Sequence, residues 1–239
     1  MKIIRDTLKS EEYFQKVIEQ TASSIEKFES IVSTVIETKG INDIGVRNGY
    51  NILVSSYTKL INLLYSAGED IEKVSDKFKK LLFYYEKMWN TEYGYFDLIR
   101  ILSMGVLLEI EPEYFAELEK RILAENFNDY LANYLLKCID NNWQQKSNTF
   151  VFPRIYDDLK VIIEQEDGNT VQLIEEYLEK KWYSNHKDAA WYNSHKSAQD
   201  VYYGYWSYEA GAVVKCMEID DTLLKDVKYY PYDLVHYKY

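Results

Sequence analysis

The chain has 239 residues, a formal net charge of −11 and 47% apolar residues, which is the composition of an ordinary folded protein and excludes intrinsic disorder. This length allows one large domain or two small ones, with a core that needs neither disulfides nor a structural metal. Glycine (9) and proline (3) together make 12 residues, against roughly 28 expected from average usage of ~7% and ~5%. Collagen-like, turn-rich β and low-complexity classes are therefore excluded, and a mostly helical protein remains.

The charge is even along the chain. Residues 1–120 carry 15 basic and 20 acidic side chains, and residues 121–239 carry 13 and 19. Binding to nucleic acid is driven by counterion release at clustered Lys and Arg, and neither half has such a cluster. We therefore expect no direct contact with DNA or RNA, and a basic partner fits this composition better.

The termini and the cysteines indicate a cytoplasmic protein. Residues 1–6 contain no apolar run typical of a signal peptide, and no stretch approaches ~18 uninterrupted apolar residues. We therefore expect a soluble protein with no membrane partner. Cys138 and Cys216 lie outside any Cys-x-x-Cys spacing, which fits two thiols that stay reduced in the cytosol.

Five helices are expected in the first half. The first begins after the capping residue Ser10 and places apolar residues at alternating steps of four and three from Phe14 to Val35, so that one stripe faces a partner helix. The glycines between 40 and 49 end it. The second helix stops at 65–68, the third carries apolar residues from 74 to 85, the fourth runs from Tyr93 to about Leu108, and the fifth runs from 112 to about 124.

The second half begins with a helix at 130–135, a polar linker at 141–148 and an extended segment at 149–153. Further helices are expected at 154–165 and 171–182. Ser197 and Asp200 form a Ser-x-x-Asp capping pattern, which predicts a last long helix from about Ala198 to Met217.

Together these elements predict an all-α fold, a multi-helix bundle of two helical halves at 1–124 and 125–239. The sequence YGYFD at 93–97, followed by an apolar helix and Glu109, resembles YGYWS at 203–207, followed by an apolar helix and Glu218. This pairing predicts a distant internal repeat of one unit in each half.

The three histidines, His186, His195 and His236, do not have the spacing of a metal site. His186 and His195 are nine residues apart and would lie on opposite faces of a continuous helix. We interpret the histidines as hydrogen-bonded framework residues. No glycine-rich phosphate loop is present, so we expect no metal and no cofactor.

Glu209 is the carboxylate that could carry acid–base chemistry. On the predicted long helix it shares an apolar face with Tyr202, Trp206 and Val213, where a carboxylate must find hydrogen-bond donors or keep its proton. We favour a hydrogen-bonded core carboxylate over a catalytic acid, because no second carboxylate or histidine has an obvious relation to it.

Two further expectations rest on the same predicted helix. Gly204 and Gly211 are seven residues apart, which predicts a smooth strip for the close approach of another helix. Trp206 is expected to be buried, so that replacing it with alanine would cost about 3–5 kcal/mol.

Acidic side chains among exposed aromatics are suited to cover a basic cleft, although they also serve solubility. The acidic residues that we select as candidate contacts with a partner protein are Asp157, Asp158, Glu175, Glu176, Asp188, Asp220 and Asp221.

The carboxy-terminal sequence resembles the bacterial PoNi immunity family. The resemblance rests on YYGYWSYEAGAVVK at 202–215, IDD at 219–221 and YYPYDLV at 229–235, together with Trp191 and His195. Residues 4–6, 13–14 and 65–68 resemble its amino-terminal domain. We interpret the following family-motif residues as fold-determining: Trp191, His195, Tyr203, Gly204, Tyr205, Trp206, Glu209, Asp221, Tyr230, Pro231 and Asp233.

The resemblance implies an all-helical, two-part protein that binds and neutralises a cognate PoNe toxin, a DNase of the PD-(D/E)xK class. Such a protein is not an enzyme, and it acts stoichiometrically in the cytoplasm. One alternative is a helical interaction scaffold with an unrelated partner. The other is a hydrolase-type enzyme in which Glu209 and His195 converge in a pocket lined by Tyr and Trp.

Overall fold

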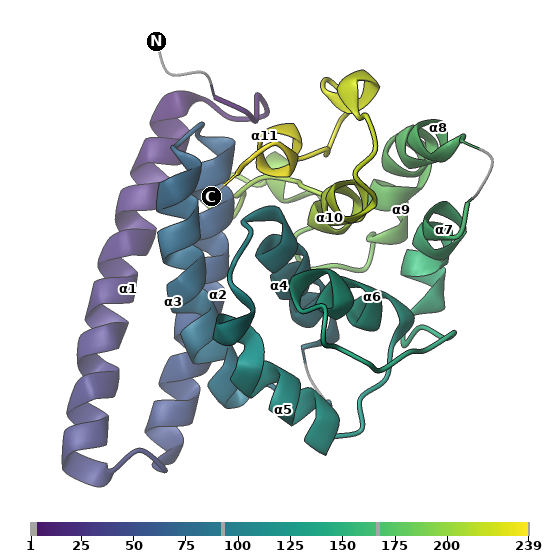
Figure 1. The fold of residues 1–239 in the computed structure, drawn as a ribbon. Helices are drawn as coiled ribbons and strands as arrows, with labels where there is room; N and C mark the ends of the chain where they lie inside the picture. The colour runs from purple at the N-terminus through teal and green to yellow at the C-terminus, as the bar shows by residue number, and fades with distance from the viewer. Residues whose placement is uncertain (1–3, 92–93, 166–167, 239) are drawn as a thin grey trace. The chain divides into compact units, whose positions relative to one another are not determined.

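The computed structural model describes residues 4–91, 94–165 and 168–238 (Figure 1). Over these residues the chain forms helices joined by turns and loops, with no strand, so the prediction of an all-α fold is confirmed. No described helix combines the length and the apolar character that a membrane crossing requires.

The chain divides into two compact units. Unit 1 comprises residues 1–89 and 193–204, and unit 2 comprises residues 90–192 and 205–239. The boundary at 124/125 that the sequence suggested lies inside unit 2, and as a division between domains it stays a prediction.

Unit 1 is built on three long helices, α1 (Glu11–Lys39), α2 (Ile44–Ser66) and α3 (Ile71–Met88). Short connections make neighbouring helices antiparallel, and α2 packs against both α1 and α3. Ser10 caps α1 as predicted, since its Oγ accepts a hydrogen bond from the Tyr13 backbone N at 3.3 Å. Four of the five buried residues of α1, Phe14, Thr21, Ile25 and Val32, are positions of the predicted stripe, and the fifth is Val17.

Gly40 ends α1 as expected, since it is the C-cap with a φ of 87°, but the later glycines Gly45 and Gly49 belong to the second helix. α1 continues to Lys39 and α2 already begins at Ile44, so Gly49 lies inside α2. A Cβ added at Gly49 would lie 2.2 Å from Cγ2 of Val32 on α1. The glycine is therefore a requirement of close helix packing, which outweighs its low helix propensity.

Unit 1 also has a short 3-10 turn (Ser194–Lys196), and the other described helices belong to unit 2. In chain order they are α4 (Tyr95–Leu107), a 3-10 turn (Pro112–Phe115), α5 (Ala116–Ala124), α6 (Tyr130–Ile139), α7 (Pro153–Ile163), α8 (Thr170–Glu176), a π-helical segment (Tyr177–Trp182), α9 (Tyr183–Asn185), α10 (Tyr208–Met217), a 3-10 turn (Thr222–Leu224) and α11 (Tyr232–Val235). α10 is central, because it packs against α4, α6, α7 and α11.

These elements agree with most of the expected ones. The polar linker at 141–148 is a loop, but the neighbouring segment at 149–153 forms no strand and leads directly into α7. The predicted start of the fourth helix at Tyr93 lies outside the described residues, and α4 is described from Tyr95.

The long helix predicted from about Ala198 to Met217 is wrong over its first half. α10 begins only at Tyr208, and residues 201–207 have no regular structure. Gly204 has a φ of 111°, which no helix includes. Ser197 does not cap a helix; its Oγ accepts a hydrogen bond from the Gln199 backbone N at 3.0 Å in a local turn.

The predicted repeat corresponds to a likeness between α4 and α10, which pack on each other. Each helix is followed by a glutamate with positive φ, Glu109 at 50° and Glu218 at 53°. Lys215 of α10 also joins the two helix ends, because its Nζ lies 3.2 Å from Oε1 of Glu109. The glycines before the two helices differ in position. Gly94 directly precedes α4, whereas Gly204 lies four residues before Tyr208, the first residue of α10.

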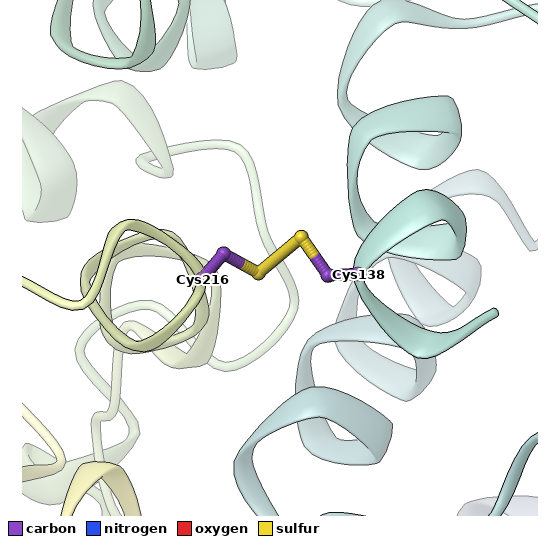
Figure 2. Close-up of a disulfide and its surroundings, with 2 residues drawn as sticks. All are labelled: Cys138 and Cys216. Atoms are coloured by element: carbon purple, nitrogen blue, oxygen red, sulfur yellow. A yellow bond between two sulfur atoms is a disulfide. The ribbon is translucent and has the colours of Figure 1, made fainter. Parts of the chain in front are cut away.

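The prediction of two reduced thiols is wrong for this structure. Cys138 on α6 and Cys216 on α10 form a disulfide within unit 2, with Cα atoms 6.1 Å apart (Figure 2). The cysteines are 78 residues apart in sequence, so no spacing pattern could indicate their pairing. The packing of α10 against α6 brings them together.

We expect this disulfide to stabilise the protein measurably. Closing a loop of this size contributes about 2–4 kcal/mol in typical cases, so reduction should lower the melting temperature by roughly 5–15 °C. Calorimetry with and without a reducing agent measures the effect. The Cys138→Ser/Cys216→Ser variant is the control, because it should melt like the reduced protein under both conditions. Equal melting temperatures for the oxidised and reduced wild type would contradict the disulfide.

Candidate functional site

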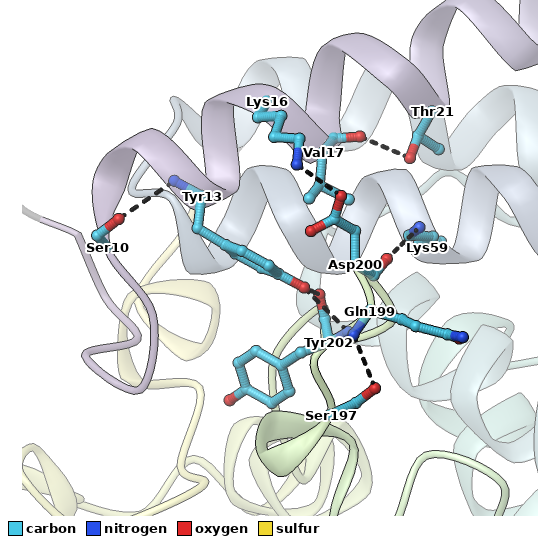
Figure 3. A network of polar contacts seen from close by, with 10 residues as sticks. All are labelled: Ser10, Tyr13, Lys16, Val17, Thr21, Lys59, Ser197, Gln199, Asp200 and Tyr202. Carbon is cyan, nitrogen blue, oxygen red and sulfur yellow. Dashed lines mark hydrogen bonds and ion pairs between the residues drawn. The ribbon is translucent and has the colours of Figure 1, made fainter.

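The first part of the family-like motif lies in unit 1, where residues 193–204 pack on α1 and α2 (Figure 3). The Tyr13 hydroxyl donates to the Tyr202 backbone O at 2.9 Å and accepts from the Tyr202 backbone N at 3.1 Å. Ser66 Oγ donates to the Tyr203 backbone O at 3.1 Å. Side chains of α1 and α2 therefore supply the partners that a helix would have given this backbone.

Ion pairing and burial hold the same segment. Lys16 Nζ lies 2.9 Å from Oδ2 of Asp200, and Lys59 Nζ donates to the Asp200 backbone O at 3.1 Å. The Tyr202 side chain is fully buried, and its hydroxyl donates to Oδ2 of the buried Asp6. Removal from water lowers the pKa of Lys59 and raises that of Tyr13.

Three of the predicted fold-determining residues belong to this segment. The ring of His195 meets that of Tyr202 edge-on at 6.2 Å, and removal from water together with Lys196 and Lys9 lowers the pKa of His195. Gly204 supplies the positive φ described above. The contacts of this segment with α1 and α2 are therefore structural ones within unit 1.

Glu209 is buried at the start of α10 in unit 2. Its Oε1 accepts from Trp182 Nε1 at 2.5 Å, Ser207 Oγ at 2.9 Å and the Tyr177 hydroxyl at 3.4 Å. Tyr202 and Trp206 do not share a helical face with it, because the helix starts at Tyr208. The carboxylate nevertheless has the hydrogen-bond donors that its burial requires.

The π-helical segment makes this arrangement possible. Tyr177 and Trp182 are five residues apart, and a π-helix closes its hydrogen bonds between residues with that spacing. Both side chains can therefore reach one carboxylate, which an α-helix would not allow. Burial and the charge of Glu209 raise the pKa of Tyr177 well above its ordinary value.

The YYPYD motif forms a third cluster. The Tyr230 hydroxyl donates to Oδ2 of the buried Asp221 at 2.6 Å, and His236 Nε2 lies 3.2 Å from the other oxygen of this carboxylate. A Cβ added at Gly211 would lie 2.6 Å from Pro231 Cγ. Gly211 thus permits a close approach, as expected, but by the 229–235 segment and without Gly204. Asp233 is exposed.

Trp191 and Tyr205 belong to an aromatic cluster in unit 2. The ring of Trp191 stacks on that of Trp182 at 5.5 Å and lies 5.4 Å from that of Tyr205. Tyr205 is buried, whereas Trp206 is only half-buried. The expected burial of Trp206 is therefore wrong, and 3–5 kcal/mol is too large a cost for its replacement by alanine.

The acidic candidates all lie in unit 2, with different exposure. Asp157, Glu176, Asp188 and Asp220 are exposed, Asp158 and Glu175 are half-buried, and Asp221 is buried. Three of them pair with a lysine or arginine: Asp158 with Lys181 at 2.7 Å, Glu176 with Lys180 at 3.4 Å, and Asp188 with Arg154 at 2.9 Å. Hydrogen bonds from Thr222 lower the pKa of Asp220.

Two observations concern the residues that the enzyme alternative would use. Within residues 4–91, 94–165 and 168–238, no three His, Cys, Asp or Glu side chains gather as metal ligands would. His195 belongs to unit 1 and Glu209 to unit 2, and each is held by partners in its own unit.

Asp129 is a structural residue that the sequence reasoning missed. It is fully buried, and it caps α6 by accepting from the Ala132 backbone N at 2.9 Å. Its Oδ2 also accepts from the Tyr95 hydroxyl and from the Val151 backbone N, both at 2.9 Å. Burial raises the pKa of Asp129, although these hydrogen bonds oppose the shift. Its place directly before a helix could have indicated the cap, but not the other two contacts.

The contact between Tyr13 and Tyr202 gives a testable prediction. Tyr13→Phe removes both hydrogen bonds to the Tyr202 backbone, and we expect it to cost about 1–3 kcal/mol. Hydrogen exchange should show faster exchange of the Tyr202 amide, while the amides of α3 serve as internal controls. Unchanged protection at Tyr202 would contradict the role of Tyr13.

Glu209 gives a second prediction. Glu209→Ala leaves the buried Trp182 and Tyr177 donors without their acceptor, and we expect it to cost about 3 kcal/mol or more. Glu209→Gln keeps an acceptor oxygen and should cost less. Urea unfolding measures both, with the exposed Glu179→Ala as control. A fully stable Glu209→Ala protein would show that the carboxylate is not structural.

Comparison with known proteins agrees with this all-helical architecture. The structure of protein PA2201 from Pseudomonas aeruginosa superimposes with a TM-score of 0.66 over 98% of each chain at 16% sequence identity, which shows a shared fold. No curated protein matches the chain. The family model described as PoNe immunity protein (PoNi), N-terminal, matches residues 5–120, and the model described as PoNe immunity proteins (PoNi), C-terminal, matches residues 127–234. The resemblance seen in the sequence motifs is thereby confirmed, and the chain belongs to the PoNi family of immunity proteins.

Proposed function

We propose that this protein binds and neutralises a cognate PoNe-type DNase toxin by stoichiometric protein–protein inhibition. The observation that carries the proposal is that the two PoNi models together span residues 5–234. Family membership supports the role of an immunity protein with a toxin as partner. That this toxin is a DNase is the further part of the proposal.

The charge of the protein supports a nuclease as partner. A DNase must present a positive surface to the phosphates of its substrate. A protein with a net charge of −11 is attracted to that surface and competes with DNA for it. No catalytic step is required of the inhibitor. Glu209, the carboxylate that the enzyme alternative would use, accepts hydrogen bonds from Trp182, Ser207 and Tyr177, which supports a structural role for it.

We place the complex in the cytoplasm, because that is where a DNase toxin reaches the chromosome. Reducing compartments keep most cysteines as thiols, so the Cys138–Cys216 disulfide is the one feature that does not suit this location.

Growth rescue tests the proposal. The nuclease encoded beside this gene is expressed in a sensitive bacterium with and without this protein, and viability and the integrity of chromosomal DNA are followed. We expect survival with intact DNA only when both proteins are present. The control is co-expression of the Glu209→Ala variant, which should rescue less in proportion to its loss of folded protein.

Degraded DNA despite abundant folded protein would overturn the pairing with this nuclease. Rescue that leaves DNA cleavage unchanged would favour the helical scaffold with an unrelated partner. Loss of rescue on Glu209→Gln, in a variant that remains fully folded, would instead favour the hydrolase-type reading.

A further inference from the structure

The net charge of the protein is confined to one of its two units. Unit 1 contains 14 basic and 14 acidic residues, whereas unit 2 contains 14 basic and 25, which together make the 28 and 39 of the whole chain. Unit 1 is therefore neutral and unit 2 carries −11. Division of the sequence into halves hides this difference. The first half then includes residues 90–120 of unit 2, and the second half includes residues 193–204 of unit 1.

Unit 2 also presents an exposed apolar patch, which we define as Phe96, Val151 and Phe152. The exposed fractions of these residues are 39%, 47% and 42%. The rings of Phe96 and Phe152 are 4.8 Å apart, and that of Phe152 lies 5.0 Å from the ring of Tyr95 beneath. Aromatic side chains that remain exposed together are typical anchors of protein interfaces.

The patch is held in a fixed shape by a buried group. Asp129 binds the Tyr95 hydroxyl and the Val151 backbone N at the same oxygen. It thereby joins the start of α4 to the residues before α7, from which the three patch side chains come. A surface that is already ordered loses little conformational entropy on binding, which favours affinity.

Acidic groups lie beside the patch. Asp97 follows Phe96 directly, 45% of its side chain is exposed, and its Oδ1 lies 2.9 Å from Nη1 of Arg100. Asp157 is exposed on α7, five residues after Phe152, and Asp188 is paired with Arg154 of the same helix. Exposed ion pairs of this kind are weak and can be exchanged for contacts with a partner.

Exposure of apolar side chains alone does not identify the docking surface. Unit 1 also has exposed apolar residues, among them Phe83 at 49%. Charge separates the two units, because unit 1 is neutral and unit 2 carries −11.

We propose that the toxin docks on unit 2, with its basic DNA-binding face over the patch of Phe96, Val151 and Phe152 and the acidic groups beside it. This inference rests on the proposed function and adds the location and the chemistry of the interface. The patch supplies the anchor, and the field of unit 2 guides the encounter. Unit 1 takes no part in attracting the partner.

Paired charge reversals test the location. Asp157→Lys/Asp188→Lys changes unit 2, and Glu19→Lys/Glu26→Lys changes the exposed face of α1 in unit 1 by the same total charge. The probe is the purified nuclease domain encoded by the neighbouring gene, made inactive by substitution of a metal-binding carboxylate. Stopped-flow kinetics at several salt concentrations measures association with each full-length protein, after melting curves have shown that the variants fold.

We expect the unit 2 reversal to slow association about tenfold at low salt and to flatten its salt dependence. The unit 1 reversal should change the rate by less than about twofold. Phe152→Ala should raise the dissociation constant about tenfold or more, whereas the equally exposed Phe83→Ala in unit 1 should leave it unchanged.

Equal effects of the two charge reversals, or an effect confined to unit 1, would overturn the docking surface. An unchanged affinity of Phe152→Ala would also overturn it. In each case the proposed function stands, because wild-type binding and rescue remain. A wild-type protein that neither binds the nuclease domain nor rescues growth would overturn the proposed function itself.

Discussion

The hydrogen bonds between Tyr13 and the backbone of Tyr202 are the constraint on which much of the structure depends. They attach residues 193–204 to α1, 189 positions away in sequence, and the hydrogen bond from Ser66 to Tyr203 attaches the same residues to α2. The chain thus leaves unit 2 after Tyr192 and re-enters it at Tyr205. Because these backbone groups are satisfied by other helices, residues 198–207 need not be helical, and α10 is shortened to Tyr208–Met217.

The excess of tyrosine has a physical reason that the structure makes visible. Among the 24 tyrosines of the chain, several donate their hydroxyl to a buried or half-buried carboxylate. The pairs are Tyr202 with Asp6, Tyr57 and Tyr84 with Glu29, Tyr95 with Asp129, Tyr177 with Glu209, and Tyr230 with Asp221. A hydroxyl satisfies an acceptor without adding a charge, so an acidic protein can bury carboxylates without a matching set of lysines.

This use of tyrosine separates structure from recognition. The buried carboxylates are occupied within the protein, and burial raises the pKa of several of their tyrosine partners. Exposed carboxylates such as Asp157 remain for a partner. The family-motif residues Glu209, Asp221 and Tyr230 are buried and hydrogen-bonded within the protein, so their role is structural. The exposed residues of an interface that discriminates between toxins can therefore change without disturbing these buried hydrogen bonds.

The sequence by itself determined the helical class and the ends of most helices, because apolar periodicity and capping residues such as Ser10 act over one or two turns. Its motifs also indicated the family, which the two family models then showed. Only the tertiary structure decided the break before Tyr208, the pairing of Cys138 with Cys216, the half-burial of Trp206 and the confinement of the charge to unit 2. Each of these depends on contacts between residues far apart in the chain, where local propensity and spacing carry no information.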